Sequence, residues 1–316
     1  MTFFLFVLGF VLLIYGANWL VDGAASIAGR RNISHVVIGM TIVALGTSAP
    51  ELVVNLVASY KETADVAVGN ILGSNIANIL LVLGASAIIF PVSVNNNTAR
   101  KEVPFALMGA FIIWVLANDS FIDGVSQSMI YRSDGIILLC FFVLFLHYAY
   151  GIAHTPIDAS DKSIKDYSLL SSVILVIAGI GGLIIGGNWI VEGAIHIALI
   201  FGMSEAVISL TIVAMGTSLP ELATCVAAAM KKNSDIIIGN VLGSNIFNIF
   251  FVLGISSVVR PLPFNRVLNF DLLTGIFVVA ILWGFIYVSG RNTLTRLGGT
   301  IFLLLYVTYI TYLLLI

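Results

Sequence analysis

The stretch TIVALGTSAPEL occupies residues 41–52, and TIVAMGTSLPEL occupies residues 211–222. Each copy places a glutamate, Glu51 or Glu221, directly after a proline inside strongly apolar sequence. An ionised side chain at the centre of a membrane helix costs about 2.5 to 3.5 kcal/mol on insertion scales, and such residues usually face a cavity and mark an ion or proton pathway. The two glutamates therefore predict a polar site inside an apolar structure.

The two copies belong to a longer repeat with a period of 170 residues. Residues 41–84 align without a gap to residues 211–254, and 25 of the 44 positions are identical. Upstream, GANWLVDGA from Gly16 matches GGNWIVEGA from Gly186 at the same offset. Because the identical positions include Thr, Ser, Pro, Glu and Asn, shared apolar composition does not account for the match.

The composition is that of a membrane protein. Hydrophobic residues make up 59% of the 316 positions, charged residues make up 9%, and the mean hydropathy is +1.10. A soluble domain is excluded by this balance, and a net charge of -2 provides no basic field for nucleic acid. A helix crosses the hydrocarbon core with about 20 mainly apolar residues. Ten segments meet this requirement, at 3–29, 35–59, 65–91, 103–118, 132–153, 168–200, 205–229, 235–259, 269–289 and 295–315.

Five of these segments separate matching points of the repeat, and an odd number of crossings inverts the second copy. The expected fold is all-α and polytopic, with inverted five-helix repeats at residues 1–154 and 168–316 joined by a polar cytoplasmic linker at 155–167. Inverted repeats are common in secondary transporters, whose sites lie near the bilayer midplane where the halves meet. With both termini outside, ten of the 14 Lys and Arg residues face the cytoplasm, as the positive-inside rule requires.

The prolines predict a break in the second helix of each half. Pro50 and Pro220 have no amide hydrogen and clash with the carbonyl one turn earlier, so the carbonyls near Gly46 and Gly216 lose their helical partners. Each glutamate then lies in the first turn of the helix that follows, where the helix dipole stabilises a carboxylate. One short stretch thus supplies backbone carbonyls, hydroxyls and a carboxylate.

The third helix of each half adds neutral oxygen atoms. It reads GNILGSNIAN at residues 69–78 and GNVLGSNIFN at residues 239–248. Calcium binds about six to eight oxygens, which this inventory can supply, whereas the motifs contain no His or Cys for zinc or copper. The expected neutral donors of this helix are Ser74, Asn75, Asn78, Ser244, Asn245 and Asn248.

Polar residues outside these motifs have simpler explanations. Asp65 and Asp235 precede the third helices and are expected to cap them. The only two cysteines, Cys140 and Cys225, lie in apolar runs and are expected to be small buried hydrophobic residues rather than a disulfide or a metal pair.

The duplicated GTSxPE and GNxxGSNxxN motifs resemble those of the sodium/calcium exchanger branch of the cation/calcium antiporter superfamily. The compact chain is similar to prokaryotic members, which implies the prokaryotic plasma (inner) membrane, transported Ca²⁺ and Na⁺, no cofactor and no obligatory protein partner. The resemblance also implies that the first and sixth helices slide past a site formed by the second, third, seventh and eighth helices.

The resemblance further implies a set of ion ligands. Relatives often carry Asp at one of the positions held here by Asn78 and Asn248, so this chain lacks a third carboxylate, which disfavours potassium cotransport. The implied side-chain ligands are Thr47, Ser48, Glu51, Ser74 and Asn78 with Thr217, Ser218, Glu221, Ser244 and Asn248, and the carbonyls of Ala44 and Ala214 match sodium positions.

Sodium/calcium exchange is therefore the expected function, and three alternatives stay open. A proton/calcium antiporter would use the same two glutamates. A passive channel would accept the same oxygens, and only counter-flux distinguishes it from an exchanger. An intramembrane enzyme with paired acids is the remote alternative, because the chain lacks a GxGD segment with a second membrane aspartate.

Overall fold

The computed structural model describes residues 2–153, 167–200, 214–288 and 292–315. Within these ranges the regular secondary structure is helical apart from four two-residue strands. The expected linker at 155–167 lies almost entirely outside the described residues. The elements of the first half are α1 (Thr2–Arg31), α2 (His35–Ile38), η1 (Gly39–Val43), α3 (Ala44–Thr47), α4 (Ala49–Tyr60), α5 (Ala64–Ala77), η2 (Asn78–Leu83), α6 (Gly84–Ile89), β1 (Val92–Ser93), α7 (Asn96–Arg100), α8 (Glu102–Leu116), α9 (Asp119–Ile122), β2 (Met129–Ile130) and α10 (Arg132–Ile152). Those of the second half are α11 (Leu169–Ile200), α13 (Ala214–Thr217), α14 (Leu219–Met230), α15 (Ser234–Ile246), η4 (Phe247–Val252), α16 (Leu253–Val259), β3 (Leu262–Pro263), η5 (Arg266–Leu268), α17 (Asn269–Val288), β4 (Thr293–Leu294) and α18 (Arg296–Leu315).

The expected all-α polytopic fold is confirmed. In the described part of the chain, seven helical runs are long and apolar enough to cross a membrane, and the bent pair His35–Thr47 and Ala49–Tyr60 makes eight if it is one span. The segment expected at 103–118 corresponds to α8, which has 15 residues. The segment expected at 205–229 begins outside the described residues and continues as α13 and α14. The count of ten spans stays a prediction.

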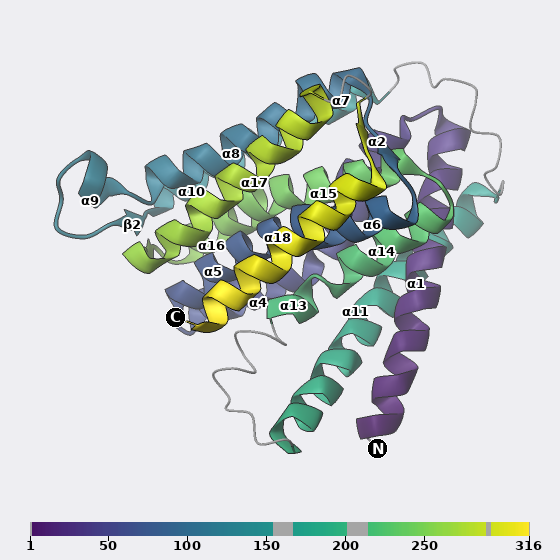
Figure 1. Cartoon of the computed structure of the whole chain (residues 1–316), viewed down its shortest axis with the longest axis horizontal. Coiled ribbons are helices and arrows are strands. Elements are labelled where there is room, and N and C mark those ends of the chain that lie inside the picture. Colours follow the sequence, from purple (N-terminus) through teal and green to yellow (C-terminus); the bar gives the residue numbers. More distant parts are fainter. Residues whose placement is uncertain (1, 154–166, 201–213, 289–291, 316) are drawn as a thin grey trace.

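Two helical runs form the centre of the molecule. In Ala64–Ile89, 78% of the most apolar stretch is buried inside the protein, and in Ser234–Val259 the buried share is 94%. In the five other long apolar runs that share is only 22% to 33%. Helix α4 packs on α5, α14 packs on α15, and α8, α10, α17 and α18 lie outside these (Figure 1). The outer helices therefore present the apolar faces that contact lipid, while the polar motifs lie in the protein interior.

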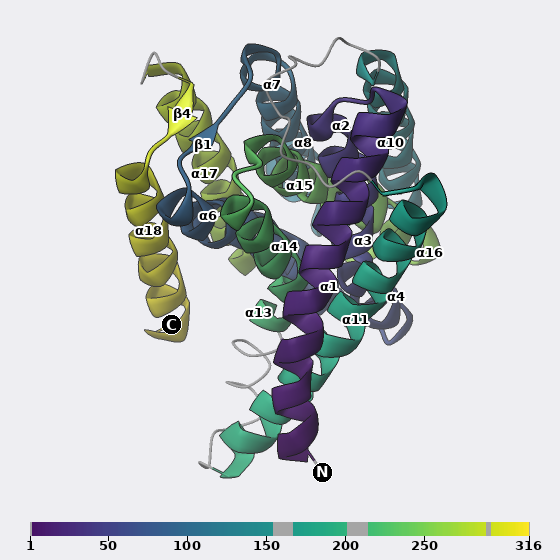
Figure 2. The same cartoon turned by 90° about the vertical axis from the view of Figure 1, so that its right-hand side faces the viewer.

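Helices α1 and α11 pack along each other and project together from the rest of the molecule (Figure 2). Gly9 faces Gly186, and Gly16 faces Gly179, so the two helices run antiparallel. A methyl group at Gly179 would lie 2.6 Å from the Leu20 nitrogen, which is closer than van der Waals contact allows. Small residues thus permit the close backbone approach that drives helix association in lipid.

Two short strand pairs also join the halves. β1 pairs with β4 and β2 pairs with β3, both antiparallel. Val92 of β1 and Leu262 of β3 are separated by the 170-residue period, and each of these two strands pairs with a strand of the other half.

Substitution of one glycine tests the α1–α11 contact. We expect Gly179→Ala to destabilise the purified protein by about 1 to 3 kcal/mol, because the added methyl overpacks the contact with Leu20. Gly181→Ala on the same helix is the matched control, since nothing lies within 4 Å of the new methyl group. Thermal unfolding in detergent measures both, and equal melting temperatures for the two variants would contradict the packing argument.

Candidate ion site

The predicted helix breaks are present at both prolines. α3 ends at Thr47 and α4 begins at Ala49, with a bend of 47° between them. In the second half α13 ends at Thr217 and α14 begins at Leu219. Each proline lies in the first turn of the helix that follows the break, α4 or α14, and so does the glutamate after it. Since a proline in the first turn has no amide hydrogen to leave unpaired, the chain can restart its helix there.

The two glutamates are buried together. Glu51 and Glu221 are each 1% exposed. The Ser48 hydroxyl, three residues before Glu51 in the first half, donates to Glu221 Oε1 at 3.1 Å. Because Ser48 is the N-cap of the helix that carries Glu51, this bond holds the start of that helix against the Glu221 carboxylate. The structure therefore brings an acidic group from each half into one buried site.

Each carboxylate is surrounded by hydroxyls from the opposite half as well as its own. Thr217 and Ser74 lie beside Glu51. The residues beside Glu221 are Thr47, Ser48 and Ser244. Neither half supplies a complete site, because residues before each proline lie beside the glutamate of the other copy.

Several oxygen atoms in this site accept no hydrogen bond from the described part of the chain. A carboxylate oxygen or an amide oxygen only accepts, and a buried acceptor without a partner costs about 1 to 3 kcal/mol, more if it is charged. A bound cation would satisfy such atoms. The unpaired acceptors are Glu51 Oε1, Glu51 Oε2, Glu221 Oε2, Asn78 Oδ1 and Asn248 Oδ1.

The asparagines at the ends of the two GNxxGSNxxN motifs are oriented by a reciprocal exchange. Asn78 Nδ2 donates to Asn245 Oδ1, and Asn248 Nδ2 donates to Asn75 Oδ1, each at 3.1 Å. Because the amide nitrogens are engaged, the free oxygens of Asn78 and Asn248 are left for another partner. Asn75 and Asn245, expected as ligands from the residues alone, instead act here as hydrogen-bond partners of these two side chains.

Both asparagines lie at π-helical segments that the sequence analysis did not foresee. η2 covers Asn78–Leu83, and η4 covers Phe247–Val252. A π-helical turn widens the helix locally and is frequent at functional sites. A π-helical turn shifts the apolar pattern of an α-helix by only one inserted residue, so the hydropathy of the sequence did not reveal these two turns.

All ten side chains implied by the resemblance are buried, and none is more than 7% exposed. The Ala44 carbonyl accepts the Ser48 amide at 2.9 Å, so it keeps an ordinary helical partner. Ala214 begins α13. Two asparagines that the sequence analysis did not select, Asn70 and Asn240, contact the threonines of the site.

Other expectations for polar residues need correction. Asp65 and Asp235 lie in the first turns of α5 and α15, whose caps are Thr63 and Asn233, so their expected capping role is wrong. Cys225 is buried as expected, but Cys140 is exposed. Within the described residues no three His, Cys, Asp or Glu side chains form a metal-binding group. The site consists of two carboxylates among neutral oxygens, which suits alkali or alkaline-earth cations.

A family model described as "Sodium/calcium exchanger protein" matches residues 1–151 and 171–315. The chain belongs to the sodium/calcium exchanger family. It is 41% identical over 262 residues to the putative antiporter CaxA of Alkalimonas amylolytica, covering 80% of this chain and 79% of that protein. It is 36% identical over 309 residues to the inner membrane protein YrbG of Escherichia coli, covering 93% of each.

The fold matches a solved structure of the exchanger NCX_Mj, soaked with Na⁺ and Sr²⁺, with a TM-score of 0.85. The sequences are 34% identical, and the match covers 98% of this chain and 99% of that one. The chain is thus an integral membrane protein of a transporter family rather than an enzyme, which confirms both expectations.

Proposed function

We propose that this protein is an antiporter that exchanges Ca²⁺ for Na⁺ across the membrane at one site between its two halves. The observation that carries the proposal is the set of buried acceptor oxygens without donors, which includes both oxygens of Glu51. The family assignment and the likeness to an exchanger soaked with Na⁺ and Sr²⁺ support these ions. The proposed ligands are Thr47, Ser48, Glu51, Ser74, Asn78, Thr217, Ser218, Glu221, Ser244 and Asn248, with the carbonyls of Ala44 and Ala214 for sodium.

The charge of the site explains why two different ions compete for it. Glu51 and Glu221 together supply a charge of about -2, which one Ca²⁺ or two Na⁺ ions neutralise equally. An empty site would carry two uncompensated carboxylates through a dry barrier, at a desolvation cost of several kcal/mol for each ion. The site therefore changes the side of the membrane to which it opens more readily with ions bound than when empty. Because each change of side then carries ions, the fluxes of Ca²⁺ and Na⁺ are coupled.

We propose that the two halves are inverted repeats within a ten-helix fold, with the boundaries 1–154 and 168–316. The antiparallel packing of the repeat-related helices α1 and α11 supports the inversion. The strands β1 and β3, which the 170-residue period relates, each pair with a strand of the other half, which supports the repeat as well. The distribution of basic residues supports both termini outside, and the likeness to YrbG supports a prokaryotic inner membrane.

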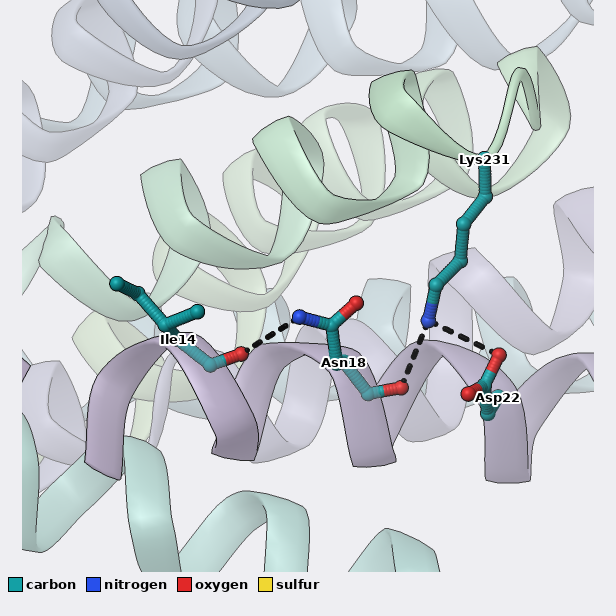
Figure 3. A network of polar contacts seen from close by, with 4 residues as sticks. All are labelled: Ile14, Asn18, Asp22 and Lys231. Carbon is teal, nitrogen blue, oxygen red and sulfur yellow. Dashed lines mark hydrogen bonds and ion pairs between the residues drawn. The ribbon is translucent and has the colours of Figure 1, made fainter. Parts of the chain in front are cut away.

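An ion pair between α1 and α14 supports alternating access (Figure 3). Lys231 Nζ contacts Asp22 Oδ1 and the Asn18 carbonyl oxygen, both at 2.9 Å. The 170-residue period relates Asp22 to Glu192 and Lys231 to Lys61, yet Glu192 and Lys61 are exposed. The Asp22–Lys231 pair thus belongs to the present arrangement, and we propose that a Glu192–Lys61 pair replaces it when α1 and α11 move.

Calcium flux tests the proposed exchange. We expect purified protein in vesicles to take up Ca²⁺ when an outward Na⁺ gradient is imposed, and not when a K⁺ or pH gradient replaces it. Uptake driven by a pH gradient without sodium would identify the proton/calcium alternative. Calcium movement without any counter-flux would identify a channel, and either result would overturn the proposal.

Neutral variants test the two carboxylates. We expect Glu51→Gln and Glu221→Gln each to reduce sodium-driven Ca²⁺ uptake at least about tenfold, because the remaining charge no longer balances Ca²⁺ in a buried site. Asp65→Asn is the control, since it removes an exposed carboxylate in the first turn of α5. Full exchange in either glutamine variant would contradict the assigned site.

The ion pair makes a separate prediction. We expect Asp22→Asn and Glu192→Gln to shift the ratio of half-saturating Ca²⁺ concentrations on the two membrane faces in opposite directions. The shift should be no more than about fivefold, since a partly exposed pair contributes about 0.2 to 1 kcal/mol. Flux measured in vesicles of uniform protein orientation gives this ratio, and shifts in the same direction would contradict the exchange of ion pairs.

A further inference from the structure

A chain of hydrogen bonds leads from Thr217 to a backbone carbonyl in the first half. The Thr217 hydroxyl donates to Asn70 Oδ1 at 3.4 Å, and Asn70 Nδ2 donates to Asn55 Oδ1 at 2.7 Å. Asn55 Nδ2 then donates to the Ala67 carbonyl oxygen at 2.9 Å. Asn55 lies on α4 one turn after Glu51 and is 0% exposed.

A corresponding chain leads from Thr47 into the second half. The Thr47 hydroxyl lies 3.1 Å from Asn240 Oδ1 and 3.3 Å from the Ala44 carbonyl oxygen, and we take the nearer atom, Asn240 Oδ1, as its acceptor. Asn240 Nδ2 in turn contacts Cys225 Sγ at 3.3 Å. The Cys225 thiol donates to the Ile237 carbonyl oxygen at 3.9 Å. The 170-residue period relates Asn55 to Cys225, so the position is the same in both halves while the residue differs.

The terminal carbonyl determines the direction of each chain. A backbone carbonyl oxygen only accepts, so Asn55 must present its nitrogen to Ala67 and its oxygen to Asn70. Asn70 must then present its nitrogen to Asn55 and its oxygen to Thr217. The second chain has the same direction. The Cys225 thiol gives its hydrogen to the Ile237 carbonyl oxygen, so its sulfur accepts from Asn240 Nδ2, and Asn240 presents its oxygen to Thr47.

This direction decides which atom of the asparagine amide faces the threonine. A hydroxyl that binds a cation does so through an oxygen lone pair, so its hydrogen needs an acceptor elsewhere. Asn70 Oδ1 and Asn240 Oδ1 are those acceptors. If either amide were reversed, its N–H would occupy the threonine lone pair that an ion needs.

We propose that Asn55 and Cys225 are positioning residues that hold the amides of Asn70 and Asn240 so that Thr217 and Thr47 direct their oxygens at the ion. The inference rests on the proposed function, in which these threonines are ligands. The first-half chain uses two amides at 2.7 and 2.9 Å, whereas the second uses sulfur, which donates and accepts weakly. The two halves thus hold their threonines with unequal strength.

The test compares variants at Cys225 with a neighbouring control. Cys225→Ala removes the acceptor for Asn240, and we expect it to raise the half-saturating Ca²⁺ concentration about two- to tenfold, the effect of one lost hydrogen bond, with the maximal rate within about twofold. Cys225→Ser restores a donor and an acceptor and should stay within about twofold of the unmodified protein. Thr224→Val is the control, because the Thr224 hydroxyl is buried and makes no hydrogen bond within the described residues.

A second variant and a second readout keep the outcome decisive. Asn55→Leu, of similar shape, should raise the half-saturating Ca²⁺ concentration as Cys225→Ala does, and it carries the test if Cys225→Ala does not fold. Equilibrium binding of Ca²⁺ to detergent-solubilised protein measures affinity independently of sodium coupling. Failure of sodium-driven uptake by the unmodified protein would refute the proposed exchange. Normal uptake with unchanged Ca²⁺ affinity in Cys225→Ala and Asn55→Leu would instead overturn the positioning role alone.

Discussion

Two carboxylates held together away from water are the constraint on which the rest of the structure depends. Glu51 and Glu221 are each 1% exposed, and three of their four oxygens accept no hydrogen bond within the described residues. Such charges are tolerated inside a protein only when nearby groups or a bound ion compensate them. The first-turn positions of the glutamates after the proline breaks and the Ser48 hydroxyl that donates to Glu221 reduce the cost of this arrangement.

Duplication provides the second carboxylate, and the packing of the copies provides its surroundings. Ser48 from the first half donates to Glu221 of the second. The asparagines of the two third helices exchange hydrogen bonds in the same way, from Asn78 to Asn245 and from Asn248 to Asn75. Hydrogen bonds between the halves therefore orient the polar side chains of both, so the site forms only when α5 and α15 lie side by side at the centre.

The sequence predicted the features that follow from local chemistry. Pro50 has no amide hydrogen, so the break at α3 and α4 and the first-turn position of Glu51 could be derived from the motif alone. Features that depend on distant contacts could not. The pairing of Asp22 with Lys231 joins residues 209 positions apart, and the π-helical turn at Asn78 leaves the apolar pattern almost unchanged. The role of Asn55 was not predicted, because the residue that the 170-residue period relates to it, Cys225, is of a different type.

In the proposed alternating access, differences between the copies matter as much as their likeness, because two identical inverted halves would give the two opposite-facing states equal energies. Asp22 corresponds to Glu192, and Asn55 corresponds to Cys225, so neither the contacts of α1 and α11 nor the support of the threonines is the same in both halves. Under that proposal, each difference would stabilise one arrangement relative to the other by an amount on the order of one hydrogen bond or surface ion pair, about 1 kcal/mol. Energies of this size would bias the resting orientation by a few-fold and leave both orientations populated, as the proposed exposure of one site to each side in turn requires.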